Sequence, residues 1–147
     1  MPEKGDLVIL DDPVAQELLH STIPARIAFT TSNGAPRVMP IWFHWNGREI
    51  VVATRQQAPK VKALSRNPKV ALIIDTEAWP NVVLTIRGTA RVEMTQGPAP
   101  EYVEAARRYT GSKEAGDAWV ARSAADGQAR IVITPEWADI LDFRKFA

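Results

Sequence analysis

The sequence predicts one α+β domain, mainly β, built round a six-stranded antiparallel β-barrel with short flanking helices. Two turns carry this prediction: Asn33–Gly34 and Asn46–Gly47 each separate segments rich in β-branched and aromatic residues, which is the pattern of successive hairpins. The chain has 147 residues, of which 46% are hydrophobic, enough for one continuous core. We find no internal repeat or low-complexity segment, so residues 1–147 are expected to form a single domain.

The individual elements follow from the spacing of apolar residues and from helix start and stop signals. Asp11–Asp12–Pro13 predicts a short capped helix directly behind it. Asn67–Pro68 is expected to end another helix, with Asn67 in the left-handed conformation, and Gly88 to mark a bulge in a long strand. The wholly apolar segment 70–75 predicts a strand covered on both faces. The expected strand segments cover residues 26–31, 37–45, 49–54, 70–75, 82–94, 129–134 and 137–143, and the later helices cover 59–66, 100–109 and 115–125.

Composition and charge exclude several classes of protein. The 18 basic and 17 acidic residues give a net charge of +1, which argues against general nucleic-acid binding. No apolar run reaches the roughly 18–20 residues that cross a bilayer, and the N-terminal segment is not a secretory signal. Cysteine is absent, which removes disulfides, thiolate metal sites and cysteine nucleophiles. We therefore expect a cytoplasmic protein with a small-molecule ligand and neither nucleic-acid nor membrane partners.

The common catalytic motifs are missing from the chain. There is no Gly-rich phosphate loop and no Ser-centred nucleophile elbow, and the only two histidines, His20 and His44, lie far apart in the sequence. Hydrolytic and zinc chemistry therefore have little support, and no metal site is expected. If the protein catalyses a reaction, a bound cofactor is expected to perform the difficult step.

The segment 54–60 joins the end of a strand to the start of a helix. Free backbone N–H groups and the helix dipole favour an anion at such a junction. Thr54 adds a hydroxyl donor, and Arg55 and Lys60 add positive charge suited to a phosphate monoester. The alternative interpretation is that these are solvated charges on a loop and a helix.

The segment 37–45 is a second candidate, because aromatic residues lie on both faces of the predicted strand. Pro40 cannot donate to a ladder, so it is expected at an edge or at a break in pairing, where free backbone groups could bind a planar heterocycle. The alternative is core packing. Alternation places Met39, Ile41, Phe43 and Trp45 on one face and Val38, Pro40, Trp42 and His44 on the other.

The sequence does not decide the role of three other groups of aromatic or basic residues. His44 could donate a proton or ligate haem iron, although a strand histidine beside tryptophans is more often packed and hydrogen-bonded. Trp79 precedes a strand and could cover a ligand or plug a hydrophobic gap. Arg107–Arg108 and Tyr109 are expected on a solvated helix face.

In their order and spacing, these motifs resemble a known family. The run G-x-P-R-V-x-P-x-W-F-x-W-N-G over 34–47 and the run P-K-x-x-x-L-x-x-N-P-x-V over 59–70 look like the pyridoxamine 5′-phosphate oxidase-like superfamily of FMN-binding split barrels. Its flavin/deazaflavin (F420) oxidoreductase branch is the most similar. The resemblance covers roughly residues 23–92. It implies a split-barrel fold and a homodimer with cofactors at the subunit interface.

Matching the family's motif residue by residue indicates where this chain departs from it. The flavin motif of the oxidases matches residues 37–42, but Trp42 replaces its lysine. The next strand end corresponds to Ala53–Thr54, the phosphate-binding Arg-Lys pair corresponds to Pro59–Lys60, and a flavin-binding glutamine is replaced by Val83. Arg55 is a candidate replacement for the lost arginine. The oxidase's downstream substrate motif also has no counterpart, so true pyridoxamine phosphate oxidase activity is not expected.

The resemblance implies an oxidoreductase that transfers hydride between F420 or FMN and a small conjugated acceptor, with F420 favoured over FMN. His44 is the only local candidate for a proton donor. Two alternatives stay open: a non-catalytic protein that stores or delivers flavin, F420 or haem, and a structural dimer with no cofactor. The residues expected to contact the cofactor are Arg37, Val38, Met39, Pro40, Ile41, Trp42, Ala53, Thr54, Arg55, Pro59, Lys60 and Trp79.

Overall fold

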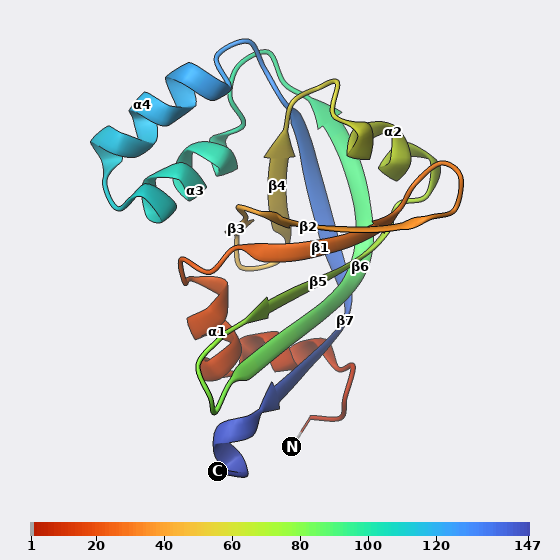
Figure 1. Ribbon diagram of the computed structural model, residues 1–147, viewed down its shortest axis with the longest axis vertical. Coiled ribbons are helices and arrows are strands. Elements are labelled where there is room, and N and C mark those ends of the chain that lie inside the picture. Colours follow the sequence, from red (N-terminus) through yellow and green to blue (C-terminus); the bar gives the residue numbers. More distant parts are fainter. Residues whose placement is uncertain (1) are drawn as a thin grey trace.

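The computed structural model describes residues 2–147 as a curled β-sheet flanked by helices (Figure 1). The chain opens with a 3₁₀ turn, η1 (Leu7–Asp11), and ends with another, η2 (Phe143–Lys145). The strands are β1 (Ala25–Thr30), β2 (Pro36–Ile41), β3 (His44–Trp45), β4 (Ile50–Thr54), β5 (Lys69–Asp75), β6 (Val82–Met94) and β7 (Ala129–Asp142). The helices are α1 (Pro13–Leu19), α2 (Pro59–Arg66), α3 (Pro100–Thr110) and α4 (Lys113–Ser123).

The seven strands form one antiparallel sheet in the order β2-β1-β5-β6-β7-β4-β3. The prediction of an antiparallel, mainly β α+β domain is confirmed, but the prediction of six strands in a barrel is wrong. Trp42 and Phe43 leave the ladder, which splits the expected strand 37–45 into β2 and β3, and the two expected C-terminal strands are one long strand, β7. Strands β2 and β3 lie at opposite edges of the sheet. Trp42 and Phe43 connect them along the chain, and no ladder of hydrogen bonds pairs the two edges.

Local sequence signals explain most helix ends. The Asp12 carboxylate accepts a hydrogen bond from the Val14 backbone N–H at 2.8 Å and caps α1, as the sequence predicts. Helix α2 begins at Pro59 and ends before Asn67, whose φ of −132° is extended. The expected left-handed conformation of Asn67 is therefore wrong, because the chain turns directly into β5 instead of closing the helix with a cap motif.

Glycine 88 marks the predicted irregularity in the long β6–β7 ladder. The pairing register shifts between Arg87 and Gly88, which confirms the expected bulge. A Cβ atom on Gly88 would collide with the backbone carbonyl of Thr134 on the facing strand. Only glycine therefore allows the two strands to approach this closely at the point where the sheet bends.

The inner face of the sheet carries the main hydrophobic core. Phe43 and Ile27 are fully buried there, and Leu19 packs against them from α1. A second, smaller cluster of Ala106, Val120 and other small residues lies between α3 and α4. Among the described residues, no helix has the length and apolar character needed to span a membrane.

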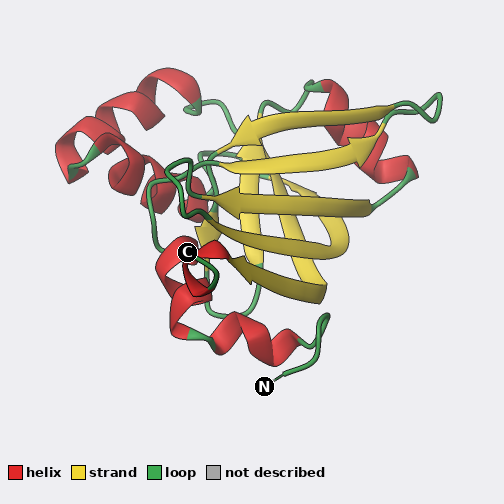
Figure 2. Ribbon diagram, turned by 60° about the horizontal axis from the view of Figure 1, so that its bottom comes forward, coloured by secondary structure: helices red, strands yellow, loops and turns green. Residues whose placement is uncertain are grey.

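The outer face of the sheet is covered less than the sequence suggests. In β5 the inward residues are buried, whereas Ala71 and Ile73 on the other face are only half-buried. Within a single chain, the prediction that both faces of this strand are covered is therefore wrong. Neighbouring strands continue this partly apolar surface, with Val38 on β2 67% exposed and Leu141 on β7 45% exposed. In Figure 2 the helices lie beside and beyond the ends of the strands, and the strands nearest the viewer are left uncovered.

Candidate functional site

A cavity of about 220 Å³ lies next to the point where the two sheet edges meet. Its residues come from five separate elements and the β2–β3 connection, so the fold rather than a local motif assembles it. We call it the Lys60 pocket. It is lined by Ile41 and Trp42 at the end of β2, Ala53 and Thr54 at the end of β4, Lys60 on α2, Tyr102 on α3 and Trp119 on α4.

Lys60 is the residue that distinguishes this cavity chemically. Only 6% of the residue is exposed, yet among residues 2–147 its ammonium makes no ion pair and no hydrogen bond. Its Nζ atom is nevertheless not sealed from solvent, since the one fully buried side-chain nitrogen or oxygen without a partner in that range is Nδ1 of His44. The ammonium therefore opens into the pocket. Burial lowers the pKa of Lys60, because desolvation penalises its charged form.

The start of α2 adds to the positive potential around Lys60. Ala58 occupies the cap position and has no side chain that could accept a hydrogen bond from the first turn. Lys60 lies in that first turn, where the free N–H groups and the helix dipole favour an anion. The hydroxyl of Thr54 lines the same cavity. A positive charge, a helix start and a hydroxyl therefore border one cavity, and the anion site expected at residues 54–60 stays a prediction.

Aromatic rings form the opposite wall of the pocket. Trp42 stacks on Tyr109 with ring centroids 5.1 Å apart and an interplanar angle of 4°. Tyr102 lies 6.2 Å from Trp42, and the Nε1–H group of Trp119 donates to the Tyr102 hydroxyl at 2.9 Å. These contacts fix the ring orientations, so the wall is a preformed surface suited to a planar ligand.

Ionic contacts hold α3, and hence this wall, against the sheet. Arg130 on β7 donates two hydrogen bonds to the Glu101 carboxylate, at 2.9 and 2.7 Å. This pairing lowers the pKa of Glu101 and raises that of Arg130. At the other end of α3, the Arg108 guanidinium donates to the Phe43 carbonyl oxygen at 2.6 Å and to the Ser21 carbonyl oxygen at 2.9 Å. Both ends of α3 are therefore fixed beside the pocket.

The expectation that Arg107–Arg108 and Tyr109 lie on a solvated helix face is wrong for two of the three residues. Tyr109 stacks on Trp42 and donates its hydroxyl to the Ile23 carbonyl oxygen at 3.0 Å. Burial raises the pKa of Tyr109. Arg108 binds backbone carbonyls as described above, and only Arg107 makes the expected surface contacts, with Asp117 and Glu104. The basic pair Arg107–Arg108 is typical of an exposed helix face, but Arg108 and Tyr109 point towards the interior.

The structure brings five of the predicted contact residues together around the Lys60 pocket: Ile41, Trp42, Ala53, Thr54 and Lys60. The other seven do not line it in a single chain. Met39 packs against the core, Pro59 is exposed at the start of α2, Arg55 lines a neighbouring polar groove, and Arg37, Val38 and Pro40 are exposed on β2. Trp79 is 69% exposed in the β5–β6 loop, where its ring lies 5.5 Å from that of Phe143 beside the C-terminal turn.

His44 lies on β3 opposite Val51, outside the lining of the Lys60 pocket. Its Nδ1 atom is buried without a hydrogen-bond partner. Burial, helped by the positive charge of Arg108, lowers the pKa of His44, so the ring is neutral at neutral pH. Among residues 2–147, no three His, Cys, Asp or Glu side chains gather in a way that could hold a metal ion.

Tyr102 and Trp119 are the two lining residues that sequence reasoning missed. Each is an aromatic residue on an exposed or half-exposed helix face, where a single ring carries no periodic signal. One available clue is that α3 and α4 together insert 24 residues between the paired strands β6 and β7, from 100 to 123. An insertion of that kind at the end of a ladder is often functional.

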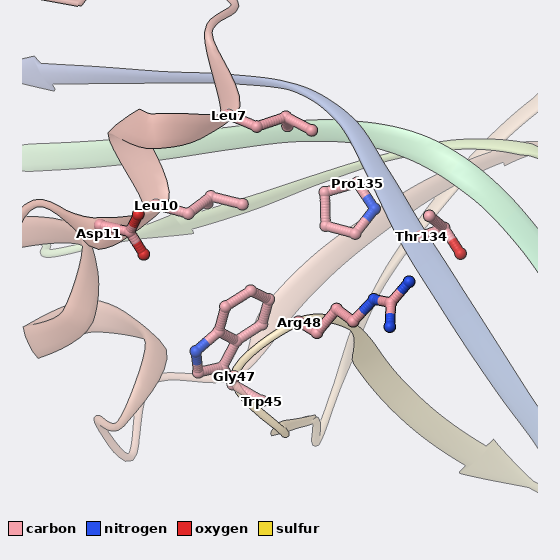
Figure 3. Close-up of a pocket in the computed structure, with 8 residues that line it drawn as sticks. All are labelled: Leu7, Leu10, Asp11, Trp45, Gly47, Arg48, Thr134 and Pro135. Carbon is pink, nitrogen blue, oxygen red and sulfur yellow. The ribbon is translucent and has the colours of Figure 1, made fainter.

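A second cavity, of about 250 Å³, lies near the other end of β4, and we call it the Trp45 pocket (Figure 3). Trp45 and Arg48 border it from the β3–β4 hairpin, and Leu7, Leu10 and Asp11 border it from η1. Arg48 is exposed rather than buried, and a carboxylate, that of Asp11, faces the same space. This cavity therefore lacks a buried cation.

A comparison with known protein families matches nearly the whole chain to one family. The sequence profile of the family described as "Pyridoxamine 5'-phosphate oxidase" matches residues 12–142. The chain belongs to that family. The resemblance inferred from the motifs at 34–47 and 59–70 is thus confirmed at the level of the pyridoxamine 5′-phosphate oxidase-like superfamily. Among curated proteins, none matches the sequence significantly.

Solved structures of the same fold carry different printed functions. An "F420 Reductase" superposes with a TM-score of 0.66 at 23% identity, covering 84% of this chain and 94% of its own. A conserved hypothetical protein from Mycobacterium tuberculosis gives 0.71 at 18% identity, covering 98% and 92%. A haem storage protein from Vibrio cholerae gives 0.63 at 18% identity, covering 89% and 93%. At these identities the likeness shows the fold of the pyridoxamine 5′-phosphate oxidase family alone.

Proposed function

We propose that this member of the pyridoxamine 5′-phosphate oxidase family is a homodimeric oxidoreductase that binds F420 or FMN in the Lys60 pocket. The observation that carries the proposal is the buried, unpaired ammonium of Lys60 at the start of α2. A buried cation without a counter-ion is costly in the free protein, and a phosphate group would supply the missing charge. F420 and FMN both carry such a group.

The residues of the pocket fit the two chemical parts of such a cofactor. Lys60 and Thr54 are suited to its phosphate, and the positive end of the α2 dipole adds to the favourable potential. The aromatic wall of Trp42, Tyr102 and Trp119 is suited to the apolar face of a fused ring system. Arg37, Arg55 and the backbone of 38–40, which lie outside the pocket, would have to contact the cofactor beyond its mouth.

The size of the pocket supports a site completed by a second subunit. A drug-sized ligand usually occupies about 300–1,000 Å³, whereas one chain provides about 220 Å³. Strand β2 borders the pocket at Ile41 and also carries the exposed Val38. A partner that covers the outer face over β2 would therefore lie beside the mouth of the pocket. Trp79, which is remote from the pocket within one chain, could reach a site only on that partner.

The outer face of the sheet is our proposed dimer surface. Its apolar residues adjoin across strands, since Ala28 pairs with Val38 on one side and with Ala71 on the other, and Val83 pairs with Leu141. Replacing Ile73 with Asp would place a charge in the middle of this surface, and the variant is expected to be a folded monomer by light scattering. A wild-type monomer that still binds cofactor tightly would contradict the dimer.

Bound F420 or FMN would supply hydride transfer to a small conjugated acceptor. The chain's own contribution would be to anchor the phosphate at Lys60, to orient the ring against Trp42 and to exclude water with Tyr102 and Trp119. His44 lies outside the pocket lining, so the structure offers it no direct path to a substrate there. A proton for the product would then come from solvent.

Side-by-side titration with FMN and F420 tests the proposal. Purified protein is titrated with each cofactor while cofactor and tryptophan fluorescence are followed, because Trp42 and Trp119 line the pocket and would report on occupancy. We expect saturable binding of at least one cofactor, tighter for F420. Turnover is then measured with the reduced cofactor and a panel of conjugated acceptors. Absence of binding to both cofactors would overturn the proposal.

A non-catalytic binding protein is the second candidate, because one solved structure with this fold is named as a haem storage protein and another as a haem-binding protein. The neutral imidazole of His44 is the form that ligates iron. Its position outside the Lys60 pocket speaks against haem in that cavity. A Soret band that is lost in His44→Ala but kept in His20→Ala would establish haem binding through His44.

A further inference from the structure

Lys60 combines three properties that rarely occur together in a lysine: the side chain is buried, no described group anchors its ammonium, and the amine opens into an aromatic-walled cavity. We infer that Lys60 is a nucleophilic amine that forms an imine with planar aromatic aldehydes entering the Lys60 pocket. This inference goes beyond the proposed function, which uses only the positive charge of Lys60.

The surroundings of Lys60 shift its protonation equilibrium towards the neutral, reactive amine. No carboxylate in the part of the chain that the structure describes pairs with it, whereas Lys4, Lys69 and Lys113 each pair with an acidic side chain. Burial lowers the pKa of Lys60, which increases the fraction of free amine near neutral pH. Desolvated lysines in apolar pockets are the type that form Schiff bases with carbonyl compounds.

The pocket defines the kind of aldehyde that would react. Trp42, Tyr102 and Trp119 present ring surfaces on which a flat aromatic compound stacks, and about 220 Å³ accommodates a small ring compound. The hydroxyl of Thr54 lines the same space and is placed to hydrogen-bond a polar group of the ligand. Since the chain contains no cysteine, no thiol competes with the amine for the aldehyde.

The reaction is a condensation that needs no oxidant or reductant. The lone pair of the neutral Lys60 nitrogen attacks the carbonyl carbon, a C–N bond forms as the C=O π bond breaks, and one nitrogen proton passes through solvent to the carbonyl oxygen. The hydroxyl of this carbinolamine then leaves as water, taking up the second nitrogen proton through solvent, and the neutral imine remains. Sodium cyanoborohydride, added in the assay, delivers hydride to the imine carbon and fixes the product as a secondary amine.

Reductive trapping with salicylaldehyde tests the inference on the full-length protein. After incubation with salicylaldehyde and cyanoborohydride, the modified lysines are identified and their rates of labelling are measured by mass spectrometry. Lys62 is the internal control, because it is on the same helix but exposed. We expect labelling of Lys60 about tenfold faster than that of Lys62, owing to the free amine and the oriented ligand. Equal rates at the two lysines would overturn the inference.

Two further arms separate this inference from the proposed function. Lys60→Arg keeps the charge but cannot form the imine, so it should lose the fast labelling while retaining a native circular dichroism spectrum. Inorganic phosphate should slow the labelling of Lys60 and leave that of Lys62 unchanged, because the anion keeps the ammonium protonated. Cofactor binding without fast labelling overturns only the amine's reactivity. Fast labelling without binding of FMN or F420 overturns only the proposed function.

Discussion

The Lys60 and Trp45 pockets lie near opposite ends of β4 and share several features. Their volumes are about 220 and 250 Å³, each has a tryptophan in its wall, and each has a basic residue in its lining. They differ in the state of the basic residue. Lys60 is 6% exposed and unpaired, whereas Arg48 is exposed and shares its cavity with the carboxylate of Asp11.

The contrast indicates which property of a cavity favours the binding of an anion. An exposed guanidinium is already hydrated and screened by salt, so an anion gains little by binding there. A largely buried ammonium has already lost part of its hydration, and the interaction with an anion is stronger in the less polar surroundings. Size and residue type therefore do not distinguish the two pockets, but burial without a counter-ion does.

The strongest test of this contrast removes the buried charge. Lys60→Ala should weaken binding of F420 or FMN by about 1.5–3 kcal/mol, the scale of a hydrogen bond to a charged group, which corresponds to a roughly 10- to 150-fold rise in Kd. Fluorescence titration measures the change. An unaltered Kd would remove Lys60 from the binding site and leave the two pockets equivalent.

A pH titration of cofactor affinity sharpens the contrast further. Because burial lowers the pKa of Lys60 in the free protein and a bound anion raises it, binding takes up a proton above the lowered pKa. Affinity should therefore be complete below that pKa and fall as the pH rises through it, by up to about tenfold per pH unit. Lys60→Arg, which stays charged, should show a flat profile over the same alkaline range. A wild-type profile equally flat would indicate that Lys60 does not bind the anion.

Most of the fold could be predicted because its signals are local. The Asn-Gly turns, the Pro59 helix start and the bulge at Gly88 each depend on the conformational preference of a few neighbouring residues. The break at Trp42 and Phe43 could not be predicted, because the alternating pattern continues through both residues. What ends β2 there is the change from one sheet edge to the other, a tertiary feature that leaves no trace in the spacing.

The candidate site also contains residues that the sequence predicts and residues that it does not. Thr54 and Lys60 follow from a strand-to-helix junction, and their burial in one pocket adds weight to a motif that alone could equally describe solvated charges. Tyr102 and Trp119 come from a helical hairpin that the sequence does not connect with 54–60. The exposure of Arg37 and Trp79 was also unforeseeable, since it depends on whether a second subunit covers the outer face.

The anchoring of the aromatic wall gives a smaller expected effect. Glu101→Gln should cost about 1 kcal/mol of folding stability, because it removes the charge from the two-pronged contact with Arg130. It should also weaken cofactor binding a few-fold, since Tyr102 is the next residue along α3. Glu104→Gln is the matched control on the same helix, where the carboxylate is exposed and its contact with Arg107 is long, at 3.4 Å. Equal losses of affinity in both variants would show that α3 does not position the wall.

The same buried charge that supports binding should cost stability. Lys60→Met retains the apolar stem without the ammonium and should raise the free energy of unfolding of the cofactor-free protein by about 1 kcal/mol. The folded-state pKa of Lys60 lies below its unfolded value, so this advantage is complete below the lowered folded-state pKa and disappears as the pH rises towards about 10.4, where the unfolded lysine also loses its proton. Denaturant unfolding at several pH values measures the difference between variant and wild type. A variant less stable than wild type at neutral pH would mean that the ammonium is well solvated.

The smallest expected effect belongs to the Trp45 pocket. Arg48→Ala should change neither cofactor affinity nor stability by more than about 0.5 kcal/mol, because the side chain is exposed and its removal leaves no buried group without a partner. The backbone N–H of Arg48, which donates to Asn46 at 2.9 Å and supports the hairpin turn, is kept in the variant. Titration with FMN and F420 beside Lys60→Ala gives the comparison under identical conditions. If Arg48→Ala weakened binding as much as Lys60→Ala, burial would not be what selects the anion site, and a cation at either end of β4 would serve equally well.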